Sequence, residues 1–210
     1  MTGGGVTGDG AIGGGVTSGG AIGSGVTDDE VTGWALAAGR GDADAAAAFI
    51  RATQRQVWRF LHHLAAPGEI EDLTQETYLR ALRSLPSFAG RSSARTWLFT
   101  IARRVAADQV RAAVSRPRTA VVEDWQAAAD AAGAAHQSRF EDDVALRDLL
   151  GGLPGERREA FVATQLLGLS YAEAAEVCDC PIGTIRSRVA RAREDLMAVL
   201  ADRDRSRPAI

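Results

Sequence analysis

The chain has 210 residues, of which 46% are hydrophobic and 24% charged, an ordinary composition for a soluble protein of one or two small domains. No apolar run approaches the ~20 residues needed to span a bilayer, and the N-terminus lacks the basic start and apolar core of a signal peptide, so we expect a cytoplasmic protein. The formal net charge of −3 argues weakly against nucleic-acid binding, but all 24 basic residues are arginines, whose planar forks suit phosphates and guanine edges.

Residues 1–30 are predicted to form a disordered, glycine-rich tail. The tripeptide Gly-Val-Thr recurs at 5–7, 15–17 and 25–27, and a repeat this rich in glycine cannot bury a core. An equally good interpretation is that the tail is not normally made. Valine can be encoded by GTG, a bacterial start codon, so initiation at Val26 would give a chain that begins Met-Thr-Asp-Asp-Glu.

A first helical domain is predicted over 42–116. Apolar residues follow helical spacing from Asp28 onward, without a credible strand pattern, and they predict helices over 42–64, 70–85 and about 93–113. In the second and third of these helices, the side chains expected in the core are Leu73, Tyr78, Ala81, Leu82, Leu85, Trp97, Leu98, Ile101 and Val105.

Arginine and acidic residues are concentrated in different parts of the chain. Residues 91–118 hold seven arginines and one aspartate, a local net charge of +6, and residues 181–193 hold four arginines and no acid. Residues 123–148 hold seven acids and two arginines, a local net charge of −5. Because DNA binding depends on the local patch, the two basic segments are compatible with it, and residues 117–140 are predicted to be a flexible linker.

A second helical domain is predicted over 141–200, with helices from Asp142 to Leu150 and from about Glu156 to Leu167. Residues 201–210 are expected to form a frayed tail.

The second domain is predicted to contain a helix-turn-helix. Ser170 and Glu173 have the spacing of a capping box at the start of a helix over 171–178, residues 179–180 make a short turn, and Pro181 opens the next helix. The apolar stripe of that next helix consists of Ile182, Ile185, Val189, Ala192 and Leu196. Its other face carries arginine, serine and threonine, a pattern that fits the major groove of DNA.

Two segments of the chain, in this order, resemble the extracytoplasmic-function group of the sigma-70 family. Asp72-Leu-Thr-Gln-Glu-Thr-Tyr and the stretch from Ser93 to Arg111 resemble the second conserved region of that group, and the stretch from Leu169 to Arg193 resembles its fourth region. The predicted fold class is all-α, with two small helical domains joined by a flexible acidic linker, the second containing the helix-turn-helix. The resemblance implies a sigma factor, without catalytic activity or cofactor, that binds core RNA polymerase, recognises the −35 and −10 promoter elements and assists strand opening.

The resemblance also implies a role for individual residues. Docking on core polymerase would involve its β′ coiled coil and its β flap, with the β′ coiled coil meeting Asp72, Gln75, Glu76, Leu79 and Arg83. The −10 element would be contacted by Ser92, Ser93, Arg95, Arg103, Arg104, Asp108, Gln109 and Arg111. The loop residues Ser92, Ser93 and Arg95 would hold an unstacked base. The −35 element would be bound by Thr184, Arg186, Ser187, Arg188 and Arg191.

Some assignments stay open at this point. Trp97 and Phe99 could stack on bases; the apolar stripe favours a core role for Trp97, and Phe99 is undecided. The acidic linker could mimic nucleic acid in the polymerase channel or simply be solvated. Many members of the group are held by an anti-sigma factor, so such a partner is possible here.

Two other classes of function fit the sequence less well. A free-standing helix-turn-helix regulator would use the same DNA-binding motif, but it would give the acidic face of helix 70–85 no role. An enzyme or metal-dependent sensor would need a phosphate loop, a nucleophile elbow or a set of metal ligands. Cys178 and Cys180 have the wrong spacing for a zinc ribbon, and His62, His63 and His136 form no ligand pattern with them, so no metal is expected.

Overall fold

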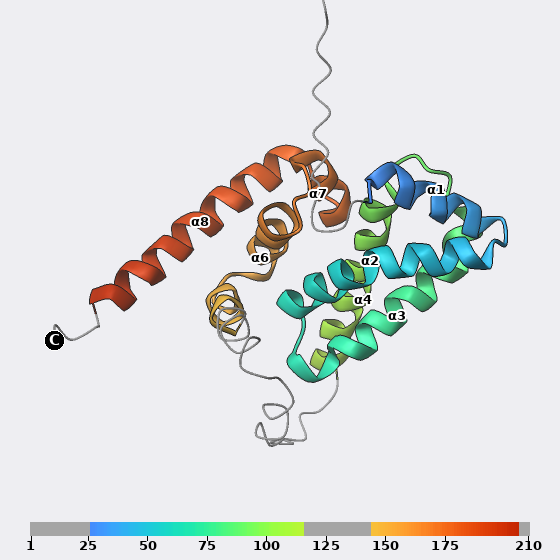
Figure 1. Ribbon diagram of the computed structural model, residues 1–210. Helices are drawn as coiled ribbons and strands as arrows, with labels where there is room; N and C mark the ends of the chain where they lie inside the picture. Colours follow the sequence, from blue (N-terminus) through green and yellow to red (C-terminus); the bar gives the residue numbers. More distant parts are fainter. Residues whose placement is uncertain (1–25, 116–143, 206–210) are drawn as a thin grey trace, which may run out of the picture.

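In this computed structural model the described residues are 26–115 and 144–205, and every regular element within these ranges is a helix (Figure 1). This confirms the predicted all-α class. The predicted linker over 117–140 lies outside the described residues.

The first unit consists of four α-helices connected by two 3₁₀ turns. The helices are α1 (Asp28–Gly39), α2 (Ala43–Leu64), α3 (Ile70–Ser84) and α4 (Ala94–Ser115), and the turns are η1 (Pro67–Glu69) and η2 (Leu85–Ser87). Side chains that precede the helices fix where they begin. The Asp42 carboxylate accepts the backbone N–H of Ala45 at 2.9 Å, and the Ser93 hydroxyl accepts that of Thr96 at 3.1 Å.

Helix α1 is part of this unit, although the predicted domain began only at residue 42. Thr27 and Glu30 form a capping box at its start, and Val31 and Ala35 are buried. Its end lies so close to η2 that a Cβ atom on Gly39 would come within 2.5 Å of a backbone oxygen. The predicted tail over 1–30 was therefore too long, because residues 28–30 are helical; residues 1–25 lie outside the described range.

The predicted core of the first unit is largely confirmed. Leu73, Tyr78, Ala81, Leu85, Leu98 and Val105 are buried, and Trp97 and Ile101 are half-buried. The placement of Leu82 was wrong, since its side chain is 38% exposed. Thr77, which was not predicted, is buried instead and donates its hydroxyl to the Leu73 carbonyl within the same helix.

The second unit contains the predicted helix-turn-helix. Residues 144–151 are helical and precede α6 (Gly155–Phe161), which continues as the π-helical turn η3 (Val162–Leu166). The motif itself comprises α7 (Tyr171–Cys178) and α8 (Ile182–Arg205).

The local chemistry of the motif is as predicted. Ser170 and Glu173 form the capping box of α7. Asp179 ends that helix in the left-handed conformation, with φ of 51°, which short polar side chains tolerate. Two details differ. Ile182 is 41% exposed and so lies outside the apolar stripe, and α8 extends to Arg205, so residues 201–205 are not the predicted frayed tail.

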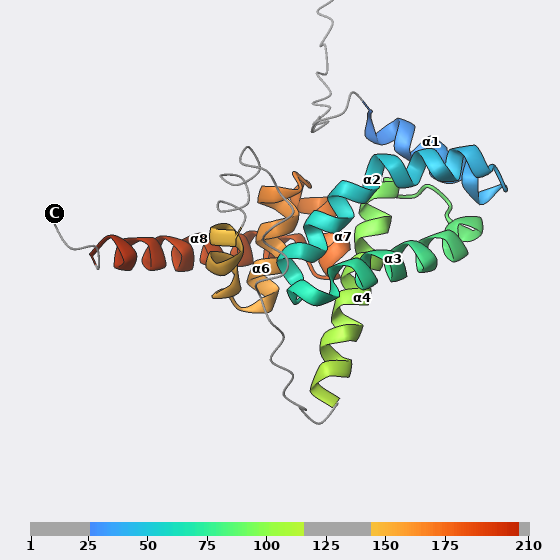
Figure 2. The same cartoon turned by 60° about the horizontal axis from the view of Figure 1, so that its bottom comes forward.

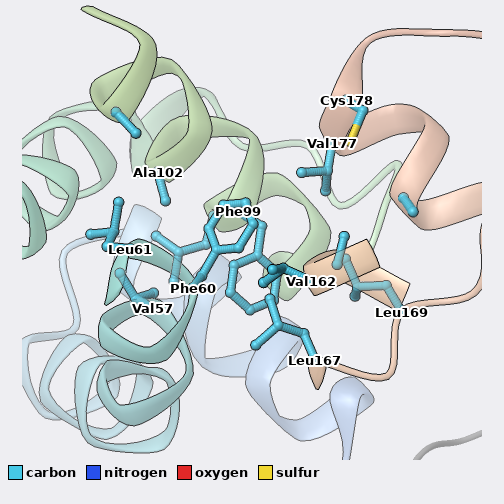
Figure 3. Packing of buried hydrophobic residues seen from close by; sticks show 14 of the residues in the cluster. Val57, Phe60, Leu61, Phe99, Ala102, Val162, Leu167, Leu169, Val177 and Cys178 are labelled. Atoms are coloured by element: carbon cyan, nitrogen blue, oxygen red, sulfur yellow. The ribbon is translucent and has the colours of Figure 1, made fainter. Parts of the chain in front are cut away.

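The two units pack against each other through a continuous apolar core, which the sequence did not predict (Figures 1 and 2). Helices α4 and α7 are in direct contact, and α2 contacts both α6 and η3. Figure 3 shows Phe60 and Phe99 of the first unit facing Val162 and Leu167 of the second. The two phenylalanine rings meet edge to face, with centroids 5.4 Å apart.

Replacing Phe99 by alanine tests the contribution of this shared core. Phe99 is 1% exposed, so Phe99→Ala is expected to lower the free energy of unfolding by about 3–5 kcal/mol through lost burial and the remaining cavity. Denaturant unfolding followed by circular dichroism measures this change. Met197→Ala is the control, because Met197 is 67% exposed and its loss should cost less than about 0.5 kcal/mol. Equal effects of the two substitutions would contradict the packing.

Candidate nucleic-acid and polymerase interface

The proposed docking face of α3 is open to solvent. Asp72, Gln75, Leu79 and Arg83 are exposed, with Leu79 at 41%. Glu76 is half-buried and accepts a hydrogen bond from Arg80 Nε at 2.7 Å. An apolar side chain ringed by polar and charged groups is the arrangement expected of a protein-contact surface.

Two of the −10 candidates connect α4 to the neighbouring elements. Arg80 of α3 donates to the Asp108 carboxylate at 2.7 Å, and Arg111 donates to the other oxygen of the same group. These hydrogen bonds, Arg80's first, lower the pKa of Asp108. Gln109 donates to Glu69 at 2.6 Å. Asp108 and Gln109 thus hold the second half of α4 in place against α3 and η1.

Arg95 and Arg103 lie between the two units. Arg95 is 7% exposed and donates to the Asp28 carboxylate at 2.9 Å and to the Leu167 carbonyl of the second unit at 3.2 Å. Arg103 Nε donates to Glu159 of α6 at 2.8 Å. Burial alone would lower the pKa of Arg103, but the hydrogen bond and the charge of Glu159 outweigh it and raise that pKa.

The remaining −10 candidates differ in exposure. Arg104 and Arg111 are exposed, and Ser92 is half-buried. Ser93 lies at the start of α4 next to Thr96, which also donates to Glu173 of α7 at 3.4 Å. The second unit therefore covers the first half of α4 and leaves Arg104 and Arg111 accessible.

The −35 candidates on α8 fall into two groups. Arg186, Ser187 and Arg191 are exposed, and neither arginine forms an ion pair within the parts of the chain that the structure describes. Arg188 is only 18% exposed and is engaged by the Glu156 carboxylate at 2.5 Å. Thr184 is half-buried. Thr184, Ser187, Arg188 and Arg191, but not Arg186, line one side of an open hollow of about 430 Å³ whose other side is the start of α6.

The two cysteines are separate thiols. Cys178 is buried in the contact between α7 and α4, and burial raises the pKa of its thiol to about 12. Cys180 is half-buried and its sulfur lies 3.4 Å from Arg188 Nη1. Within the described residues, no three histidine, cysteine or acidic side chains gather as metal ligands would.

Sequence reasoning missed the acidic partners of Arg95, Thr96 and Arg103 on α4. Asp28, Glu159 and Glu173 lie 67, 56 and 77 residues along the chain from the α4 residues that they contact. Periodicity reports only neighbours on the same helix, so it carries no information about such pairs.

Family comparisons cover both units. The family described as sigma-70 region 2 matches residues 49–116, and the family described as sigma-70 region 4 matches residues 143–196. The chain is 53% identical over 171 residues to the ECF RNA polymerase sigma factor SigC of Mycobacterium tuberculosis, covering 81% of this chain and 91% of that protein. It is 33% identical over 164 residues to the ECF RNA polymerase sigma-E factor of Escherichia coli, covering 74% of this chain and 86% of the relative.

Solved structures show the same fold. CnrH, in complex with the cytosolic domain of CnrY, matches with a TM-score of 0.66 at 23% identity, over 83% of this chain and 99% of CnrH. The sigma factor RpoE of Bartonella quintana, in complex with the anti-sigma factor NepR, matches with a TM-score of 0.56 at 28% identity, over 72% of this chain and 94% of RpoE. None of the helices in the described ranges combines the length and apolar character that crossing a bilayer requires.

A double-mutant cycle on Arg103 and Glu159 tests the polar contact between the units. Both side chains are 25% exposed or less, so Arg103→Ala and Glu159→Ala are each expected to lower the free energy of unfolding by about 1–2 kcal/mol, and the double variant by less than their sum. Denaturant unfolding provides all three values. The control pair is Arg205 and Asp202, whose side chains are more than 70% exposed and should show no measurable coupling. Additive effects at Arg103 and Glu159 would refute the contact.

Proposed function

The chain belongs to the extracytoplasmic-function group of the sigma-70 family, and from this membership we propose how its surfaces act in promoter-directed transcription. It is a sigma factor: it directs RNA polymerase to promoters. Members of this family are not catalysts. This chain likewise acts not as a catalyst but by binding core polymerase and promoter DNA in the cytoplasm.

The α3 face is the docking surface for core polymerase. Leu79 supplies apolar contact, while Asp72, Gln75, Glu76 and Arg83 offer polar and charged partners. Helix α8 takes the −35 element through its exposed front, and α4 with the preceding loop takes the −10 element. This assignment is supported by the exposure of both the α3 face and the front of α8, and by the four arginines of α4.

Contact of Arg95 and Arg103 with the −10 element requires the two units to separate. Arg95 and Arg103 cannot reach DNA while they hold Leu167 and Glu159. The closed arrangement therefore keeps Arg95 and Arg103 of the free protein from the −10 element. Docking on core polymerase favours an open arrangement, because a ligand shifts an equilibrium by its differential affinity for the two states. RpoE of Bartonella quintana was solved with an anti-sigma factor; a protein of that kind that binds this chain stays a prediction.

Run-off transcription tests the function itself. Core polymerase with this chain is expected to start at defined sites on genomic fragments, and core polymerase alone is not. Leu79→Arg should reduce this transcription by about tenfold or more, since a buried interface residue near the centre of a contact is worth about 2 kcal/mol. Gln54→Ala, an exposed change on α2, should leave it unchanged. Equal initiation with and without the chain would overturn the proposed function.

Loosening the closed arrangement should improve promoter binding by the free protein. Glu159→Ala removes the partner of Arg103 and is expected to tighten binding to a mapped promoter fragment by about three- to tenfold, through a larger open population. Glu176→Ala removes the same charge from an exposed position of α7 and should change binding less than about twofold. Fluorescence anisotropy at fixed salt compares them. Equal gains from both variants would show that only charge, and not opening, is responsible.

A further inference from the structure

Four arginines of α8 look equivalent in the sequence but occupy two different settings. Arg186 and Arg191 are exposed and form no ion pair among the described residues. Arg188 instead donates to Glu156 of α6, and Arg193 donates to Gln165 Oε1 of η3 at 2.8 Å. The four arginines therefore differ in what they contact rather than in the helix face that carries them.

Arg188 is the most constrained of the four. Its Nη2 donates to the Glu156 carboxylate at 2.5 Å, and its Nη1 donates to the Cys180 sulfur at 3.4 Å. Its side chain is 18% exposed, whereas that of Glu156 is 74% exposed. Both ends of the guanidinium fork are thus occupied, and a bidentate contact with a guanine would require Arg188 to leave both partners.

The contacts of Arg188 connect three parts of the motif. Glu156 lies in the first turn of α6, Cys180 lies in the turn between α7 and α8, and Arg188 lies two turns into α8. Nearby, Arg157 of α6 donates to Asp195 of α8 at 2.6 Å. Two ion pairs of opposite polarity therefore join α6 to α8, and they fix both the position of α8 along α6 and its rotation about its own axis.

We propose that Arg188 does not read the promoter but is a positioning residue, held by Glu156 and Cys180 so that α8 presents Arg186, Ser187 and Arg191 to the −35 element. This inference rests on the proposed function. Glu156 is an exposed carboxylate on a DNA-binding domain, where its negative charge would repel DNA phosphates. Its charge therefore does not serve DNA binding directly. A positioning role explains why the carboxylate lies at this place.

The test uses holoenzyme assembled from core polymerase and the full chain, with a panel of single base-pair changes across the −35 element of a mapped promoter. Glu156→Gln is expected to weaken binding to every promoter in the panel by about two- to fivefold without changing their order. If Arg188 read a base directly, releasing it from Glu156 would leave affinity unchanged or raise it. That result would overturn the proposal.

A charge exchange gives the second measurement. Glu156→Arg and Arg188→Glu each place like charges together and should weaken binding, whereas the double variant restores an ion pair of reversed polarity and should return to within about threefold of the original affinity. A glutamate cannot replace an arginine at a guanine edge, so a direct reader would not be rescued. Failure of the double variant to recover, with its thermal unfolding unchanged, would overturn the proposal.

Reference variants separate this inference from the proposed function. Arg186→Ala and Arg191→Ala should each relax discrimination at particular base pairs, by about fivefold or more, because a good arginine–base contact is worth at least that much. If they have no effect, the assignment of the −35 surface itself fails. If they act as expected while Glu156→Gln does not, only the positioning role of Arg188 is lost.

Discussion

The apolar contact between α4 and the second unit determines which surfaces of this protein are available. Phe99 and Phe60 are fully buried against Val162 and Leu167 (Figure 3), and burial of such side chains is the dominant favourable contribution to association. The contact is made by the same half of α4 that carries Arg95 and Arg103. A shift from 1% to 99% open requires a partner that favours the open state by about 5.5 kcal/mol. Under the proposed function, a partner that opens the protein must therefore bind the open state much more tightly than the closed one.

The polar contacts explain how an acidic chain can serve as a DNA-binding protein. Carboxylates of Asp28, Asp108 and Glu159 accept hydrogen bonds from arginines of α3 and α4, much as phosphate oxygens would. The acids thus neutralise a basic surface while the chain is free. The formal net charge of −3 is a sum over the whole chain. It gives little information about the local potential of α8, where no acid pairs with Arg186 or Arg191 among the described residues.

Local features of the fold were predictable, and long-range features were not. The capping box at Ser170, the apolar stripe of α8 and the bounds of α2 and α3 follow from periodicity and end signals within a few residues. Leu82 and Ile182 were misplaced because an apolar residue at helical spacing need not face the core. The sequence of α4 does contain a sign of the contact between the units. Phe99, Ala102 and Ala106 form a second buried face of this helix beside Leu98 and Val105. A helix that is apolar on more than one side has more than one neighbour.

The candidate site shows why residue type alone does not fix a role. Family resemblance placed Arg95, Arg103, Arg186 and Arg188 together as promoter contacts. In the structure, Arg95 and Arg103 donate hydrogen bonds to the second unit. Arg188 donates to Cys180 in the turn between α7 and α8, and Arg186 is exposed to solvent. A guanidinium binds a carboxylate, a carbonyl and a phosphate by the same geometry, so its partner depends on which oxygen lies nearest in a given state. Under the proposed function, Arg95 and Arg103 would exchange a protein oxygen for DNA when the units separate, whereas the contacts of Arg188 lie within one unit.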